Sequence, residues 1–319
     1  MKKDDEKVKI SKEDIAIMQI MTSNCRLPLS AVAKLSHMSR ERTTYRFQRL
    51  LNAGVISSFV TEIDASKLGF SSAAVFLKIA RSHLSQIILL IKENESISWS
   101  TEFSGTWNIG FGVFGKNFLE IDEKIQIILS KVKPQILYSE IMYIQTIDYY
   151  YHKYFRAKES KNKKIAECSV DSIDKKILRS LSQNPRRTIL DIAAQTKITA
   201  ATVQKHIKKL VAGRVITNFA AIIQLNKIDR LLYSVFFTPQ DFVERNKLLS
   251  YCQTHPDILF AVTYYNESRF EVGIKVKSPY DLAQVISQVE EFVHGTRVSS
   301  VNLVQEEIVG SGLPSICFK

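Results

Sequence analysis

Hydrophobic positions recur in two alternating patterns along the chain, and each pattern occurs twice. In residues 169–224, apolar side chains at three- and four-residue spacing predict three short helices, around Ile177, Ile192 and Val203. The following stretch Val215–Ile223 is rich in β-branched residues and predicts a strand that could form a wing hairpin. Residues 10–63 have the same order. We therefore predict a winged helix-turn-helix in both segments.

The two remaining segments predict sheets. Residues 228–310 have the order βαββαβ, with strands at Leu231–Thr238, Ile258–Tyr265, Phe270–Lys277 and Val298–Ile308 and helices at Asp241–Thr254 and Tyr280–Val293. Residues 68–148 have the same order, with strands at Ala73–Ile79, Ile97–Phe103, Ile109–Phe114 and Leu137–Thr146 and helices at Leu84–Lys92 and Phe118–Val132. The predicted fold class is α+β: two winged helix-turn-helix domains alternate with two ferredoxin-like βαββαβ domains.

A shift of 160 residues places Asp14–Phe59 on Asp174–Phe219 without a gap. The identical pairs are Asp14/Asp174, Ile17/Ile177, Asn24/Asn184, Arg26/Arg186, Ala33/Ala193, Leu50/Leu210, Val55/Val215, Ile56/Ile216 and Phe59/Phe219. Most other apolar positions in this stretch exchange only with apolar residues. A period of this length is too long for a solenoid unit, so it indicates tandem duplication of a whole subunit.

The net positive charge of the chain is concentrated in the repeated unit and in the linker between its copies. The chain has 44 Lys and Arg against 32 Asp and Glu, a formal charge of +12. Residues 10–60, 149–168 and 169–220 carry +4, +4 and +7, whereas residues 70–148 and 225–310 carry −1 and −3. Such clustering predicts a surface for a polyanion. Within the linker, we expect the Tyr and Phe residues of 149–155 to pack on an αβ domain and Lys161, Lys163 and Lys164 to be solvated.

The third helix of each copy turns polar and basic side chains away from its core. These candidate DNA contacts are Arg40, Arg42, Thr44, Tyr45, Arg46, Gln48 and Arg49 in the first copy and Thr202, Gln204, Lys205, Lys208 and Lys209 in the second. A helix in the major groove presents its N-terminal residues to bases and its C-terminal residues to phosphates. Arg42 therefore suits guanine and Gln204 adenine. The alternative is a solvated basic face, but the same placement recurs in both copies.

These residues support a family resemblance. The second copy contains Asp174-x-x-Ile177-Leu178, Ala193 and Gly213-x-Val215-Ile216, and the first contains Asp14, Ala33 and Gly54-Val55-Ile56, followed by Leu68-Gly69. The chain thereby resembles the Lrp/AsnC, or feast/famine, transcription regulators, in which a winged helix-turn-helix precedes an αβ (RAM-type) domain. Family members usually carry one copy and dimerise, so the duplication implies an intramolecular pseudo-dimer that binds double-stranded DNA and could form further homo-oligomers. The expected domains are winged helix-turn-helices at 10–63 and 169–224, effector or dimerisation-like αβ domains at 68–148 and 228–310, and a basic linker at 149–168.

The resemblance also implies a small-molecule effector, such as an amino acid, at a loop between two strands of each αβ domain. The corresponding candidates are Ser104, Gly105 and Asn108 in the first half and Asn266 and Arg269 in the second. The acidic residue usual at the end of this loop is replaced by Asn108 and by Arg269, so an ammonium group lacks its expected partner. The alternative is that these domains only dimerise.

We find no motif of an enzyme, a metal site or a cofactor site: the chain has no GxSxG, HExxH, P-loop or GxGxxG, and its four cysteines form no CxxC pair. Its longest aliphatic run is Ile87–Ile91, and its N-terminus has no apolar signal region. We expect a cytoplasmic, nucleoid-associated protein without a cofactor. Two alternatives remain. Siroheme decarboxylases are similar in architecture, but their Arg and His around the wing are missing from residues 59–65 and 219–224. A weakly specific architectural DNA-binding protein needs only charge and oligomerisation.

Overall fold

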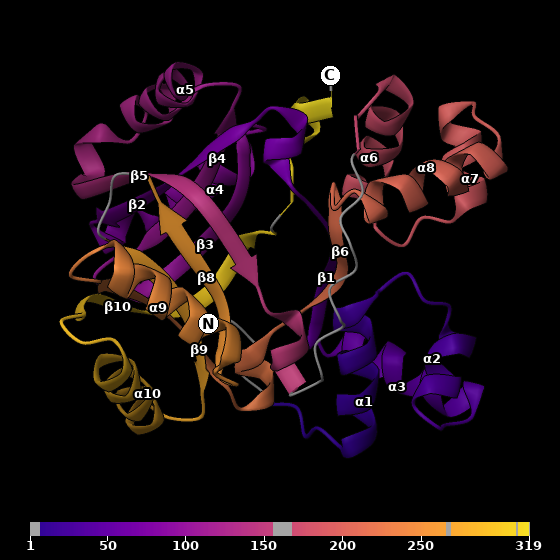
Figure 1. Ribbon diagram of the computed structural model, residues 1–319, viewed down its shortest axis with the longest axis horizontal. Helices are drawn as coiled ribbons and strands as arrows, with labels where there is room; N and C mark the ends of the chain where they lie inside the picture. The colour runs from indigo at the N-terminus through magenta and orange to yellow at the C-terminus, as the bar shows by residue number, and fades with distance from the viewer. Residues whose placement is uncertain (1–6, 156–167, 266–268, 311, 319) are drawn as a thin grey trace. The chain divides into compact units, whose positions relative to one another are not determined.

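The computed structural model describes residues 7–155, 168–265, 269–310 and 312–318. The chain folds into two compact units, and each unit combines segments from both halves of the sequence (Figure 1). The αβ unit comprises residues 71–155 and 225–309, together with Lys7. The head unit comprises residues 8–70, 168–224 and the C-terminal residues 310–318. The predicted solvated lysines of the linker lie outside the described residues.

The head unit contains the two copies of the helical repeat. The first copy consists of α1 (Lys12–Ser23), α2 (Leu29–Leu35), α3 (Arg40–Asn52) and β1 (Ile56–Ile63), and the second of α6 (Ser172–Gln183), α7 (Ile189–Thr196), α8 (Ala200–Ala212) and β6 (Ile216–Ile223). Capping boxes formed by Ser11 with Asp14 and by Asp171 with Asp174 begin α1 and α6. His37 and Lys197 adopt left-handed φ angles of 55° and 57° in the turns before α3 and α8.

The strands of the two copies pair with each other. β1 and β6 form a two-stranded antiparallel sheet in which Val60 lies opposite Ala220 (Figure 1). The expected wing hairpin within one copy is therefore wrong. After each strand the chain enters a short 3-10 helix, Ala65–Leu68 or Leu225–Ile228, instead of turning back. Each strand consequently pairs with the strand of the other copy, which satisfies the backbone groups along the edge that they share.

The αβ unit is a closed eight-stranded barrel. Its first half contributes β2 (Ser71–Ile79), α4 (Leu84–Lys92), β3 (Ile97–Gly105), β4 (Ile109–Gly115), α5 (Phe118–Ser130) and β5 (Ile136–Tyr149). Its second half contributes β7 (Leu231–Thr238), α9 (Phe242–Thr254), β8 (Ile258–Tyr264), β9 (Phe270–Val276), α10 (Pro279–Phe292) and β10 (Arg297–Val309). The strand order is β10-β3-β4-β2-β5-β8-β9-β7, so each predicted βαββαβ half is a four-stranded sheet. Pairing of β5 with β8 and of β10 with β3 closes the barrel and leaves no free edge.

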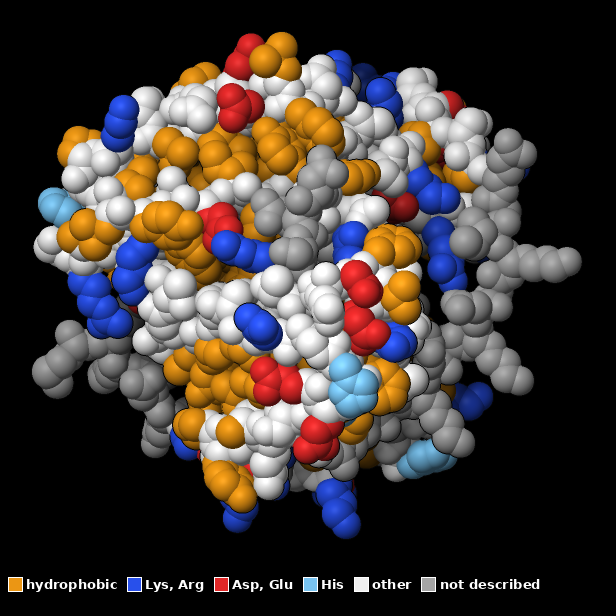
Figure 2. Space-filling model, turned by 60° about the vertical axis from the view of Figure 1, so that its left-hand side comes forward, with side chains coloured by type: hydrophobic (Ala, Val, Ile, Leu, Met, Phe, Trp, Pro, Cys, Tyr) orange, Lys and Arg blue, Asp and Glu red, His pale blue; other side chains and the backbone are white. Residues whose placement is uncertain are grey.

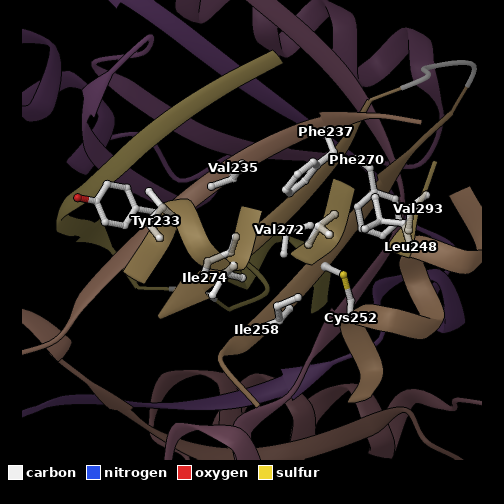
Figure 3. Packing of buried hydrophobic residues seen from close by; sticks show 14 of the residues in the cluster. Tyr233, Val235, Phe237, Leu248, Cys252, Ile258, Phe270, Val272, Ile274 and Val293 are labelled. Carbon is white, nitrogen blue, oxygen red and sulfur yellow. The ribbon is translucent and has the colours of Figure 1, made fainter. Parts of the chain in front are cut away.

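Three hydrophobic clusters fill the αβ unit. Side chains on the outer face of each sheet pack against the helices of the same half, as Figure 3 shows around Val235, Val272 and Leu248. The inner faces of both sheets share one cluster inside the barrel. Across it, the rings of Phe76 and Phe236 meet edge to face with centroids 5.2 Å apart.

The beginning of the linker packs on the second half of the αβ unit. Tyr150 is buried in the cluster that also contains Leu248, and the Nζ atom of buried Lys153 donates a hydrogen bond to the carbonyl of Cys252. Lys275 in turn donates to the carbonyl of Lys153 at 2.9 Å. The expectation that the linker aromatics pack on an αβ domain is confirmed for Tyr150.

The surface of the protein is mixed in character. In the view of Figure 2, hydrophobic side chains form several patches among single charged groups. Large exposed hydrophobic residues of the αβ helices include Leu119, Phe242 and Tyr280. In the part of the chain that the structure describes, no helix is both long and apolar enough to span a membrane.

Candidate DNA-binding surface

The predicted contacts on α3 divide into exposed and tethered side chains. Arg40, Arg42, Thr44, Tyr45 and Gln48 are exposed, and the ring of Tyr45 is 71% accessible. Arg42 forms a 2.6 Å ion pair with Glu13 of α1, although its side chain stays 59% accessible. Its guanidinium could therefore exchange this carboxylate for a base or phosphate at little cost, because exposed ion pairs are weak.

Arg46 and Arg49 are only partly exposed because α1 holds them. Asp14, fully buried at the start of α1, accepts from Arg46 at 3.1 Å and from Arg49 at 2.8 Å. Burial alone raises the pKa of Asp14, but hydrogen bonds from Ser11 and the two guanidinium groups more than offset it, so the pKa lies below its usual value. One aspartate thus caps α1 and fixes the angle at which α3 crosses it.

On α8, Gln204, Lys205 and Lys208 are exposed and Thr202 is partly exposed. The Thr202 hydroxyl shares a 2.8 Å hydrogen bond with Thr199, the residue that caps α8 as predicted. Lys205 and Lys208 therefore form the exposed basic edge of the second recognition helix.

Lys209 differs from those two lysines because it is tethered to buried Asp174, the counterpart of Asp14. Asp174 lies 2.6 Å from Lys209 Nζ and 2.7 Å from His206 Nδ1. The hydrogen bond with Asp174 raises the pKa of Lys209, so its ammonium stays charged. Asp171, Asp174 and His206 lie close enough to hold a metal ion, but the ammonium of Lys209 already pairs with both carboxylates, at 3.5 Å from Asp171 and 2.6 Å from Asp174.

The candidate effector residues are placed in the αβ unit. Ser104 and Gly105 end β3, and Gly105 is exposed at a φ of 150°. Asn108 is buried, and its Oδ1 accepts a 2.9 Å hydrogen bond from the amide of Ile79. Arg269 forms an ion pair with Glu140. Asn108 and Arg269 are thus engaged within the protein, and Asn266 lies outside the described residues.

Two sets of residues that organise this surface escaped the sequence analysis. Asp14 and Asp174 were noted only as an identical pair of the repeat and as part of the family pattern, yet they tether the recognition helices. Arg26 and Arg186 were noted only as identical, yet each reaches into the other copy. Most of the identical pairs between the two copies are apolar. The fact that two of these pairs are charged is the signal that could have identified all four residues.

Comparisons with known proteins agree with the repeat. A model of the winged helix-turn-helix DNA-binding family matches residues 11–57 and, again, residues 170–217. An uncharacterised HTH-type transcriptional regulator of Pyrococcus abyssi is 28% identical over 148 residues, which are 44% of this chain and 99% of that protein. Another from Pyrococcus furiosus is 22% identical over 126 residues, 39% of this chain and 85% of that protein. Less than half of this chain therefore covers most of the length of each relative, as a duplication predicts.

The whole chain also has a counterpart among solved structures. The siroheme decarboxylase NirDL superposes with a TM-score of 0.61 at 11% identity, covering 95% of this chain and 94% of that one. At this identity the likeness concerns the fold, which confirms the α+β class with two helix-turn-helix and two αβ domains. The winged helix-turn-helix family model thus matches both copies of the repeat, in agreement with the tandem duplication that the sequence predicts.

Proposed function

We propose that this protein is a DNA-binding transcription regulator of Lrp/AsnC type that acts as a single-chain pseudo-dimer on an operator with two different half-sites. The observation that carries the proposal is the antiparallel pairing of β1 with β6, which joins two unlike recognition helices in one unit. A homodimer repeats one helix and therefore prefers a palindrome. Here Arg42, Thr44 and Tyr45 face outward in one head, and Thr202, Gln204 and Lys205 in the other.

In this proposal the side chains near the start of each recognition helix contact bases. Arg42 and Tyr45 would do so from α3, and Thr202 and Gln204 from α8. Arg40, Lys205 and Lys208 would contact phosphates, because they are exposed cations. Arg46, Arg49 and Lys209 would chiefly hold their helices in place through Asp14 and Asp174. Such a regulator would act in the cytoplasm, at the nucleoid.

Selection of bound fragments from random duplex DNA, near physiological ionic strength (~0.15 M), tests the proposal. We expect an enriched motif with two dissimilar halves. Arg42→Ala should relax the preference at one position of one half, while Arg81→Ala, an exposed arginine of the αβ unit, should leave the motif unchanged. A palindromic motif would contradict the pseudo-dimer. Binding without enrichment would favour the architectural protein.

A siroheme decarboxylase is the second candidate, because the fold of NirDL covers 95% of this chain. The residues argue against it, since residues 59–65 and 219–224 contain no Arg or His to hold tetrapyrrole carboxylates. Titration with an iron tetrapyrrole, followed by absorbance, separates the two functions. A stoichiometric spectral change together with no DNA binding would replace the regulator by the enzyme.

We further propose that an amino-acid effector would bind at the end of β3, where Ser104 and Gly105 are accessible and Asn108 is not. The Gly105 carbonyl accepts a 2.8 Å hydrogen bond from Lys78 Nζ. The ammonium group of Lys78 therefore lies at this end of β3. Thermal unfolding with each amino acid in turn tests the site. A ligand that binds the folded state raises the melting temperature, and Ser104→Ala should reduce that rise. No rise with any amino acid would contradict the effector.

A further inference from the structure

The loop between the first two helices of each head carries the same two polar residues, Asn24 with Arg26 and Asn184 with Arg186. In both loops the asparagine Oδ1 accepts a 3.0 Å hydrogen bond from the arginine amide, two residues later. This is an Asx turn, which fixes the backbone of the arginine locally. Among the described residues, the hydrogen bonds and ring contacts of each arginine side chain are with the other head.

Each of these arginines reaches into the other copy. Arg26 Nη1 donates to the carbonyl of Pro185 at 2.5 Å, and Arg186 Nη1 donates to the carbonyl of Cys25 at 2.6 Å. Cys25 is fully buried and Pro185 is buried as well. Burial lowers the pKa of both guanidinium groups. Two partly buried cations at one interface are costly unless specific partners hold them, so their contacts favour one relative position of the heads.

The aromatic contacts of the two arginines are unequal. The guanidinium of Arg186 lies 5.2 Å from the ring centroids of both Phe47 and Phe59. Phe47 belongs to the recognition helix α3, and its ring centroid lies 6.4 Å from that of Phe59 on β1. Arg186 therefore contacts both the first recognition helix, through Phe47, and the strand that follows it, through Phe59.

In the second head, the matching positions are Ile207 and Phe219. Arg26 stacks at 5.2 Å on Phe219 of β6. Its stack therefore involves the strand, whereas that of Arg186 involves the recognition helix itself. Cation–π contacts of desolvated arginines contribute most at such sites.

We propose that Arg186 is a positioning residue that couples the first recognition helix to the second head, so that the two heads bind half-sites at a single fixed spacing. Arg26 makes the reciprocal but weaker coupling. The strand pair β1–β6 joins the heads, and further hydrogen bonds cross between the copies, from Thr61 Oγ1 to the Leu181 carbonyl at 2.8 Å and from the Cys25 amide to the Phe219 carbonyl at 2.7 Å. Arg186 adds the contact that reaches α3.

This inference rests on the proposed function, and a spacing series tests it. The full chain is titrated with duplexes that carry the two selected half-sites at separations varied one base pair at a time, and with each half-site alone. The unaltered protein should bind best at one separation. Arg186→Gln should lose about tenfold in affinity at that separation, flatten the dependence on spacing and leave the affinity for an isolated half-site unchanged.

Three variants control for general damage. Arg187→Gln alters the neighbouring arginine, which bonds to Ser180 of its own head at 2.9 Å, and should keep the spacing preference. Arg26→Gln should flatten it less than Arg186→Gln. Phe59→Leu removes one of the two rings on which the Arg186 guanidinium stacks, and it should reproduce the effect of Arg186→Gln. The test therefore stays valid if Arg186→Gln folds poorly.

The outcomes separate the two proposals. An unaltered chain with no preferred spacing would overturn the two-half-site function. A preferred spacing that persists in both Arg186→Gln and Phe59→Leu would overturn the coupling role of Arg186 and leave the proposed function standing. An equal loss of isolated half-site affinity in Arg186→Gln would make the residue merely structural.

Discussion

The phenol of Tyr264 donates a 2.6 Å hydrogen bond to Oε2 of Glu271 inside the barrel of the αβ unit. The other carboxyl oxygen of Glu271 accepts from Ser234 at 2.6 Å. Burial raises the pKa of Glu271, and these two hydrogen bonds offset only part of that rise. Glu271 lies opposite Phe236 of β7, and the residue opposite Phe76 of β2 in the first half is Gly110. The polar group therefore lies in only one half of the barrel core.

This arrangement predicts a specific pH dependence. The folded chain keeps a proton on Glu271 at pH values where the unfolded chain has lost it, so stability falls as the pH rises from about 4.5 through the raised pKa. Glu271→Gln should remove this fall while keeping hydrogen bonds to Tyr264 and Ser234. Urea unfolding at a series of pH values measures it, with the exposed Glu290→Gln as control. Parallel curves for the unaltered chain and Glu271→Gln would contradict the prediction.

Asp174→Asn should destabilise the second head strongly. The variant leaves Lys209 and His206 without their buried carboxylate and weakens the capping box of α6. Asp174 is fully buried, whereas Lys209 is partly exposed, and loss of hydrogen bonds between charged groups typically costs ~1.5–3 kcal/mol. Asp191→Asn makes the same chemical change in the capping box of α7, but at an exposed position, and should cost ~1 kcal/mol. Equal losses in chemical denaturation would show that Asp174 only caps its helix.

Gly105→Ala should destabilise the αβ unit. A β-carbon at Gly105 would stand 2.3 Å from the carbonyl oxygen of Val301, a backbone atom that cannot swing aside, and φ is 150°. Gly295 has a positive φ as well, but the nearest atom to its β-carbon would be Oε1, the far end of the flexible Gln240 side chain, at 2.4 Å. We expect the alanine at 105 to cost ~3 kcal/mol and that at 295 ~1 kcal/mol in unfolding experiments. The reverse order would show that the β3 end adjusts freely.

Periodicity alone predicted most of the elements correctly. The strand Leu231–Thr238 and the helix Leu84–Lys92 begin and end at the predicted residues, because alternation and helical spacing are local signals. The pairing of β1 with β6 was not predictable in this way, since a strand sequence does not say which copy supplies its partner. The same limit applies to the site: helical spacing identified the exposed Tyr45 and Lys208, whereas the tether of Arg49 to Asp14 depends on how two helices cross.

The two kinds of lysine on α8 should differ in their contribution to DNA affinity. Each phosphate contact by a cation adds about 0.9 to the slope of log affinity against log salt. Lys205→Ala with Lys208→Ala removes two exposed cations and should reduce the slope by about 2.

Lys209→Ala should reduce that slope by much less than 1 and should instead lower the melting temperature, because the ammonium of Lys209 is committed to Asp174 at 2.6 Å. The exposed pair Lys92 and Lys131 of the αβ unit, both changed to alanine, is the control of equal charge. If that control lowers the slope as much as the α8 pair, DNA does not bind along α8. If Lys209→Ala alone lowers it by a full unit, the lysine leaves its aspartate when DNA binds, and the recognition helix is released from α6 in the complex.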